Sequence, residues 1–245
     1  MGFFVIFLIV GISVRESAPD EVMLFWEDYL IKIFAGTQEI RQMERASSFY
    51  IPKEWLIVEF LFFILIAKYP KKDLEEQGIQ VLLRTRSKGV WWLSKCIWLI
   101  CSGVLYYGVF YLAMIVNAIV DNPMTGLHIK IRDIWQIGLE GCSQMEVNMI
   151  LFVMPLLCSL AIGMVQMLLS IAFSPVLALC VSIAYQVLAV AVQKSWILGN
   201  YTMLCRHEPI YVNGVRDWKG ILFSTGIFFI GIFLGMKHMK KKEFF

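Results

Sequence analysis

The side chains able to do chemistry in this chain are few and widely spaced. Its three histidines, His128, His207 and His238, stand far apart in the 245-residue sequence and form no H-E-x-x-H pair. The six cysteines include no C-x-x-C pair. Zinc and redox centres are usually built from such closely spaced ligands. The sequence therefore predicts no metal site.

Adjacent carboxylates at Glu75 and Glu76 raise the possibility of an enzyme. They match the start of the E-E-x-x-x-R motif of glutamate-dependent intramembrane proteases, but Gln80 stands where that motif has arginine. None of the histidines falls in an apolar segment, where such a protease places them. The pattern favours a non-enzymatic role and leaves a membrane-embedded enzyme as an alternative.

Glu59 is the one carboxylate within an apolar segment predicted to span a membrane. Ionisable groups are costly in lipid and are functional suspects there. Glu59 lies one helical turn after Trp55, so it either reaches the outer membrane interface or lines a path between helices. Gln166, Tyr185 and Gln186 either hydrogen-bond between helices or contact a molecule that passes between them. The candidate path residues are therefore Glu59, Gln166, Tyr185 and Gln186.

The composition places these side chains in a membrane protein. The chain is 59% hydrophobic and 17% charged, with a mean hydropathy of +0.69, more apolar than soluble domains usually are. Its apolar runs have helical lengths, and a helix satisfies its own backbone hydrogen bonds in lipid. We predict an all-α polytopic membrane protein, one domain over residues 1–245, with six transmembrane helices near residues 2–14, 55–67, 90–120, 147–171, 176–192 and 220–236.

Two local features refine this layout. Phe173, Ser174 and Pro175 interrupt an otherwise continuous apolar block, and proline there predicts a tight turn between the fourth and fifth helices. The first apolar segment spans only roughly 20 Å. We expect an inner-leaflet segment before it, with a cleaved signal peptide as the competing interpretation.

Lysine and arginine orient the helices, because basic flanks tend to stay in the cytoplasm. Basic side chains outnumber acidic ones by seven to three in residues 68–95 and by four to one in residues 237–245. Acidic side chains outnumber basic ones by eight to five in residues 15–54 and by four to two in residues 121–146. Both termini and residues 68–95 should therefore be cytoplasmic. The net charge of +3 reflects this topology, and no nucleic-acid partner is expected.

Three features are expected outside the membrane. Residues 22–34 have an apolar side at helical spacing, which lies either on the outer leaflet or against the protein's own helices. Residues 121–146 interleave apolar and polar side chains and predict an external cap. Cys142 and Cys205 both fall on this side, so a disulfide between them remains open.

The charged segment at residues 69–95 predicts a short amphipathic helix at the inner membrane surface. Trp91 and Trp92 follow where the third apolar helix begins, and we expect their indoles at the headgroup boundary. The segment is either a solvated loop with an aromatic anchor or a handle for a soluble partner.

Two stretches resemble a known family. EEQGIQVLLRTRS followed by GVWWLSK resembles the cytoplasmic loop of type-2 exporter class ABC transporter permeases, which share the six-helix layout. LGNYTMLCRHEPIYVNGV, residues 198–215, resembles the last external loop of permeases from bacterial lantibiotic and other antimicrobial-peptide systems. The chain departs from these permeases at its start, where they usually carry a basic amphipathic segment.

The resemblance implies a permease subunit in the bacterial plasma membrane that exports, or gives immunity to, an antimicrobial peptide. Two permease subunits, alike or different, would associate with a dimer of ATPase subunits that bind ATP and Mg. This chain carries no cofactor and has no G-x-x-x-x-G-K-[ST] run to hold a phosphate. A non-transporting immunity or scaffold protein is the alternative. The candidates for coupling to the ATPase are Glu76, Gln77, Gln80, Leu83, Arg84 and Arg86.

Overall fold

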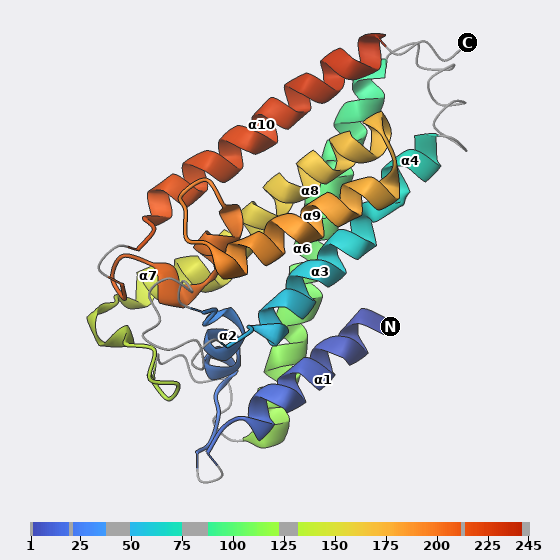
Figure 1. Ribbon diagram of the computed structural model, residues 1–245. Coiled ribbons are helices and arrows are strands. Elements are labelled where there is room, and N and C mark those ends of the chain that lie inside the picture. The colour runs from blue at the N-terminus through green and yellow to red at the C-terminus, as the bar shows by residue number, and fades with distance from the viewer. Residues whose placement is uncertain are drawn as a thin grey trace.

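The structure is a computed structural model that describes residues 2–19, 22–37, 50–74, 88–122, 132–211 and 214–241 (Figure 1). Regular structure within these ranges is helical, with no strand and one isolated β-bridge between His207 and Val215. The predicted all-α class is therefore confirmed for the described residues.

Each of the six apolar segments predicted from the sequence forms a helix. The elements are α1 (Gly2–Glu16), α2 (Trp26–Phe34), α3 (Lys53–Ala67), α4 (Tyr69–Asp73), α6 (Lys88–Asp121), η4 (Leu139–Gly141), α7 (Gln144–Asn148), the π-helical η5 (Met149–Val153), α8 (Met154–Ala172), α9 (Pro175–Ala191), η6 (Leu198–Thr202), η7 (Leu204–Arg206) and α10 (Asp217–Lys241). Among the described residues, three helices are long and apolar enough to cross a membrane: α6, the run from α7 through α8, and α10. Six crossings remain a prediction.

The turn between α8 and α9 forms where proline predicted it. Ser174 has extended backbone, and its hydroxyl accepts a hydrogen bond from the Leu177 N–H at 3.2 Å. Pro175 follows as the first helical residue, where its missing N–H costs nothing. A serine cap and a proline start therefore turn the chain back on itself as a helical hairpin.

A second proline is accommodated inside the long helical run. Pro155 has no N–H to offer the Leu151 carbonyl, and the backbone before it widens into the π-helical turn η5. The Tyr111 hydroxyl of α6 donates to the Leu151 carbonyl at 3.0 Å. A side chain from a neighbouring helix thus satisfies a carbonyl that proline leaves without its usual partner.

Helix α8 occupies the centre of the bundle and contacts α10, α9, α6 and α3 (Figure 1). Of the three long apolar helices it is the most enclosed, and α10 is the most exposed. Helix α4, the turn between α8 and α9, and the end of α10 lie at one end of the bundle, while α2 and α7 lie at the other (Figure 1). The described parts of the two basic segments, residues 68–95 and 237–245, therefore lie at the same end of the bundle.

Helix α2 packs against the protein's own helices, which is one of the two arrangements expected for residues 22–34. Asp28, Tyr29 and Leu30 are buried, and α2 contacts α6, α1 and α3. Arg132 forms an ion pair with Asp28, and the Trp135 indole donates to the Asp28 carbonyl at 2.9 Å. Part of the predicted cap thus covers α2. Burial raises the pKa of the Asp28 carboxyl, while a backbone hydrogen bond and Arg132 act in the opposite direction.

The prediction that the two tryptophans at the start of α6 anchor to headgroups is wrong. Trp91 is nearly buried and Trp92 completely so. The Trp91 indole donates to Asp73 Oδ2 at 3.1 Å, and the Trp92 indole donates to the Ile232 carbonyl of α10 at 3.0 Å. Each ring has a hydrogen-bond partner inside the protein, so neither needs the interface.

Candidate functional site

Glu59 lies on α3 and is completely buried, so the interpretation that it reaches the outer interface is wrong. Its Oε2 accepts hydrogen bonds from Ser159 Oγ of α8 at 2.9 Å and from Gln186 Nε2 of α9 at 3.0 Å. The neighbouring Trp55 suggested an interface, but its ring is also buried and its indole donates to Thr202 Oγ1 at 2.9 Å. The carboxyl is therefore enclosed where helices meet.

Tyr107 of α6 completes this arrangement. Its hydroxyl lies 2.6 Å from Ser159 Oγ and 3.4 Å from Glu59 Oε1. Glu59, Tyr107, Ser159 and Gln186 come from four different helices and are all buried. We call these four residues the polar junction. It links α3, α6, α8 and α9 through side-chain hydrogen bonds in an otherwise apolar core.

The other two candidate path residues lie outside the polar junction. Gln166 Nε2 donates to the Phe63 carbonyl of α3 at 2.8 Å. The Tyr185 hydroxyl donates to the Trp196 carbonyl at 2.7 Å and accepts from the Leu198 N–H at 3.0 Å. The structure therefore brings Glu59 and Gln186 together, and uses Gln166 and Tyr185 to hold backbone segments.

The polar junction contains a carboxyl that has no cation beside it in the part of the chain that the structure describes. Among the described residues, no lysine, arginine or histidine lies within salt-bridge distance of Glu59. Those residues also include no group of three histidine, cysteine or acidic side chains placed to hold a metal ion. The chemistry within reach of this arrangement is the binding of a proton and the exchange of hydrogen bonds between helices.

Sequence inspection missed Tyr107 and Ser159. Hydroxyl-bearing side chains are ordinary in apolar helices, and neither residue lies beside a charged or amide side chain in the sequence that would single it out. A weak signal existed in the charge of Glu59, because a carboxyl in an apolar helix needs partners. The charge indicates that Glu59 has hydrogen-bond partners, but it does not identify the residues that provide them.

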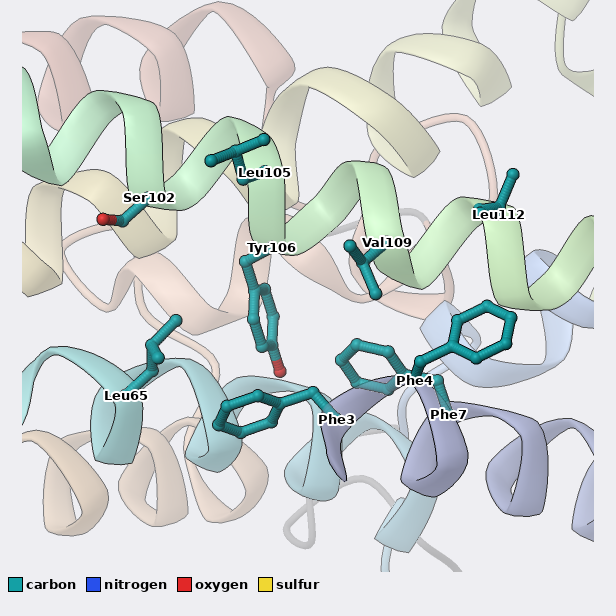
Figure 2. Close-up of a pocket in the computed structure, with 9 residues that line it drawn as sticks. All are labelled: Phe3, Phe4, Phe7, Leu65, Ser102, Leu105, Tyr106, Val109 and Leu112. Atoms are coloured by element: carbon teal, nitrogen blue, oxygen red, sulfur yellow. The ribbon is translucent and has the colours of Figure 1, made fainter. Parts of the chain in front are cut away.

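An apolar groove of about 500 Å³ opens between α1, α3 and α6 (Figure 2). Phe3, Phe4 and Phe7 of α1 line it together with Tyr106 of α6. The Tyr106 hydroxyl is used in a hydrogen bond to the Val58 carbonyl. The lining matches hydrocarbon better than a charged group.

The described ends of the charged segment are tied together. Asp73 of α4 forms an ion pair with Lys95 of α6 at 2.8 Å, and the Tyr69 and Trp98 rings stack with centroids 4.0 Å apart. The Lys71 ammonium donates to the Phe173 carbonyl at the turn between α8 and α9. The ATPase-coupling candidates at positions 76 to 86 lie outside the described residues.

Replacing Lys95 with methionine is expected to lower the free energy of unfolding by about 1–3 kcal/mol, because it leaves the mostly buried Asp73 carboxylate without its cation. Thermal unfolding of the purified protein in detergent measures the change. Lys240→Met is the control, since Lys240 is exposed at the same end of the bundle. Adding Asp73→Asn should recover part of the loss. A Lys95→Met protein that melts with the wild type would contradict a structural ion pair.

Arg206 organises the opposite end of the bundle and is completely buried. Its guanidinium donates to the carbonyls of Ala189 and Val190 in the last turn of α9, to the Thr37 carbonyl, and to Asn200 Oδ1. A cation is favourable at a helix C-terminus, where carbonyls point outward without helical partners. Arg206 therefore closes the end of α9 and joins it to two external segments.

The disulfide left open from the sequence is absent, since Cys142 and Cys205 are both free thiols. Burial raises the pKa of the Cys205 thiol to about 11. The pKa of the Cys142 thiol is also raised, chiefly by burial. Neither has the lowered pKa of a reactive thiol.

Comparison with known proteins places the chain in no family. No protein-family model matches it, and no curated protein or solved structure is significantly similar to it. Its class therefore rests on its own features: it is a helical protein, and three of its described helices suit a membrane.

Proposed function

We propose that this chain is the membrane-spanning permease subunit of an ATP-driven ABC exporter, acting in export of, or immunity to, an antimicrobial peptide. Six helices would cross the bacterial plasma membrane with both termini in the cytoplasm. A second permease subunit, the same or different, would complete the transport path. A dimer of separate ATPase subunits would bind ATP and Mg and supply the energy, so the chain would not itself be an enzyme.

The observation that best supports this proposal is the anchoring on both sides of residues 75–87. Asp73 and Lys95 hold α4 beside α6, and Lys71 reaches the turn between α8 and α9. A partner bound to the intervening segment would therefore transmit force to α4, to α6 and to the end of α8. Coupling to an external motor requires such a connection between a docking segment and the transmembrane helices.

The polar junction suits a permease that alternates between two arrangements. Glu59 and Gln186 are buried among packed helices, so cargo can reach them only after those helices separate. ATP binding in the partner would shift the population between packed and separated arrangements. The apolar groove beside α1 gives an amphipathic cargo a hydrocarbon-like surface.

Affinity purification from native membranes tests the proposal. The chain carries a tag on its C-terminal tail, and the wild type is compared with the double variant Gln80→Glu plus Arg84→Glu. The matched control is Gln144→Glu plus Lys194→Glu, which makes similar charge changes at exposed positions outside the charged segment. We expect an ATPase subunit to copurify with the wild type and the control and to be lost from the Gln80/Arg84 variant.

Two other outcomes would change the assignment. If no ATPase copurifies with the wild type, the permease proposal fails, and direct toxin binding by the purified chain becomes the test of an immunity protein. If the ATPase copurifies equally with all three proteins, the permease assignment stands and the coupling role of Gln80 and Arg84 fails. ATP-dependent export by the reconstituted complex then separates transport from scaffolding.

A further inference from the structure

We infer that the polar junction is a proton-binding site, in which the Glu59 carboxyl carries a proton while the four helices are packed together. This inference goes beyond the proposed function, because it concerns the chain alone and needs neither an ATPase nor a cargo. It rests on a count of hydrogens, on burial, and on the absence of a described cation.

The count of hydrogens comes first. Three oxygen-to-oxygen contacts form a closed ring: Ser159 to Glu59 at 2.9 Å, Tyr107 to Ser159 at 2.6 Å, and Tyr107 to Glu59 at 3.4 Å. Ser159 and Tyr107 have one hydroxyl hydrogen each. These two hydrogens serve the two shorter contacts, from Ser159 to Glu59 and from Tyr107 to Ser159. The longer contact between the Tyr107 oxygen and Glu59 Oε1 then has a hydrogen only when Oε1 carries a proton.

The donors can then be assigned around the ring. Ser159 donates to Glu59 Oε2, so its oxygen is free to accept from the Tyr107 hydroxyl. Tyr107 has then used its hydrogen and accepts from the protonated Oε1 of Glu59. Gln186 Nε2 donates to Oε2, which remains a carbonyl-type acceptor in the acid form. Every contact receives one hydrogen.

Among the described residues, the groups around Glu59 give no charge to balance an ionised carboxylate. The described titratable groups that face Glu59 are the hydroxyls of Tyr106, Tyr107 and Tyr111 on α6 and the Cys158 thiol on α8. All four are neutral at pH 7 in their ordinary state. Helix α9 contributes the neutral amide of Gln186. An unpaired buried charge is strongly unfavourable, and the usual response is to take up a proton.

The site links helix packing to proton binding. If α3 moves away from α8 and α9, water reaches Glu59 and the carboxyl releases its proton to that water. A water-exposed glutamate ionises near pH 4.3. Above that pH the packed arrangement holds one more proton than the opened one. Each unit rise in pH therefore lowers the ratio of packed to opened protein tenfold, until Glu59 ionises in the packed arrangement as well. Acidic conditions therefore favour the packed arrangement.

Infrared spectroscopy of the full-length protein in lipid vesicles at pH 7 provides the first test. The difference between wild type and Glu59→Gln should contain the C=O stretch of a protonated carboxylic acid. A carboxylate band in its place would overturn the inference. Tyr107→Phe is a second variant that keeps the carboxyl, and loss of its hydroxyl should shift the acid band. An unshifted acid band would overturn the inference, because the protonated acid would then lie outside the polar junction.

Thermal unfolding across pH 5 to 8 provides the second test. Glutamine has the shape and the hydrogen-bonding pattern of a protonated glutamate, with an amide N–H placed to donate to Tyr107. Glu59→Gln should therefore fold as well as wild type at pH 5. As the pH rises, the unfolding equilibrium constant of the wild type should increase relative to that of Glu59→Gln by up to tenfold per pH unit. A Glu59→Gln protein that is less stable than wild type at pH 7, with a parallel pH profile, would indicate an ionised carboxylate and overturn the inference. If Glu59→Gln does not fold, the infrared band shift in Tyr107→Phe decides.

Discussion

The Arg206→Met variant is expected to unfold with a free energy about 3–5 kcal/mol lower than the wild type. Methionine retains much of the side-chain volume but donates no hydrogen bond. The carbonyls of Ala189, Val190 and Thr37 and the Asn200 amide oxygen would lose this donor in a buried site. Each buried acceptor left without a partner costs about 1–3 kcal/mol, and neighbouring losses are not fully additive.

Melting temperatures of the purified variants in detergent would measure this effect. Arg216→Met is the matched control, because Arg216 is an arginine of the same external region whose salt bridge to Glu208 lies at the exposed surface. It should melt close to the wild type. Arg206→Lys should fall between the two, since an ammonium cannot reproduce the planar fork that reaches several acceptors. An Arg206→Met protein that melts with its control would show that water replaces the guanidinium.

Helix positions could be predicted from the sequence because their causes are local. The apolar runs and the Ser174–Pro175 turn act through hydrophobic length and proline chemistry, and both predictions are confirmed as helices and as a turn. Whether all six helices cross a membrane is a different question. Helices α1 and α3 have 15 residues each, roughly 22 Å, which is shorter than a typical hydrocarbon core.

The candidate site could be predicted only in part because its partners are distant in the sequence. Glu59 and Gln186 were identified as unusual side chains in apolar helices, and they do meet. Tyr107 and Ser159 lie 48 and 100 residues from Glu59, and nothing local marks them as its partners. Convergence of this kind depends on how α3 packs against α6 and α8, which apolar patterning does not specify.

The sequence predictions based on Trp55 and Trp92 are wrong for the same physical reason. An indole has an apolar body and one N–H, so it suits either a headgroup boundary or a core position with an acceptor. Trp55 and Trp92 both take the core position, donating to Thr202 Oγ1 and to the Ile232 carbonyl. Only the tertiary structure shows that the acceptor is present.

The contact between Trp92 and α10 leads to the second large effect, expected in Gly235→Ala. A Cβ at position 235 would lie 2.0 Å from Trp92 Cε2 and 2.3 Å from Trp92 Nε1. The Trp92 ring is rigid and completely buried, so it cannot yield without breaking its hydrogen bond to Ile232. Overpacking of this kind typically costs 1–3 kcal/mol, and loss of the hydrogen bond adds about 1 kcal/mol. We therefore expect a loss of about 2–4 kcal/mol.

Gly226→Ala is the matched control on the same helix, because a Cβ there meets no atom within 4 Å. Alanine favours helix more than glycine does, so this variant should melt at or slightly above the wild-type temperature. Trp92→Phe removes the ring atoms that the new Cβ would strike, so the double variant Gly235→Ala plus Trp92→Phe should lose less than the sum of the two single losses. Strict additivity, or a Gly235→Ala protein as stable as Gly226→Ala, would show that α10 does not approach α6 this closely at Trp92. A loss in the double variant that is smaller than the sum would instead show that the end of α10 holds the start of α6, beside the charged segment, in place.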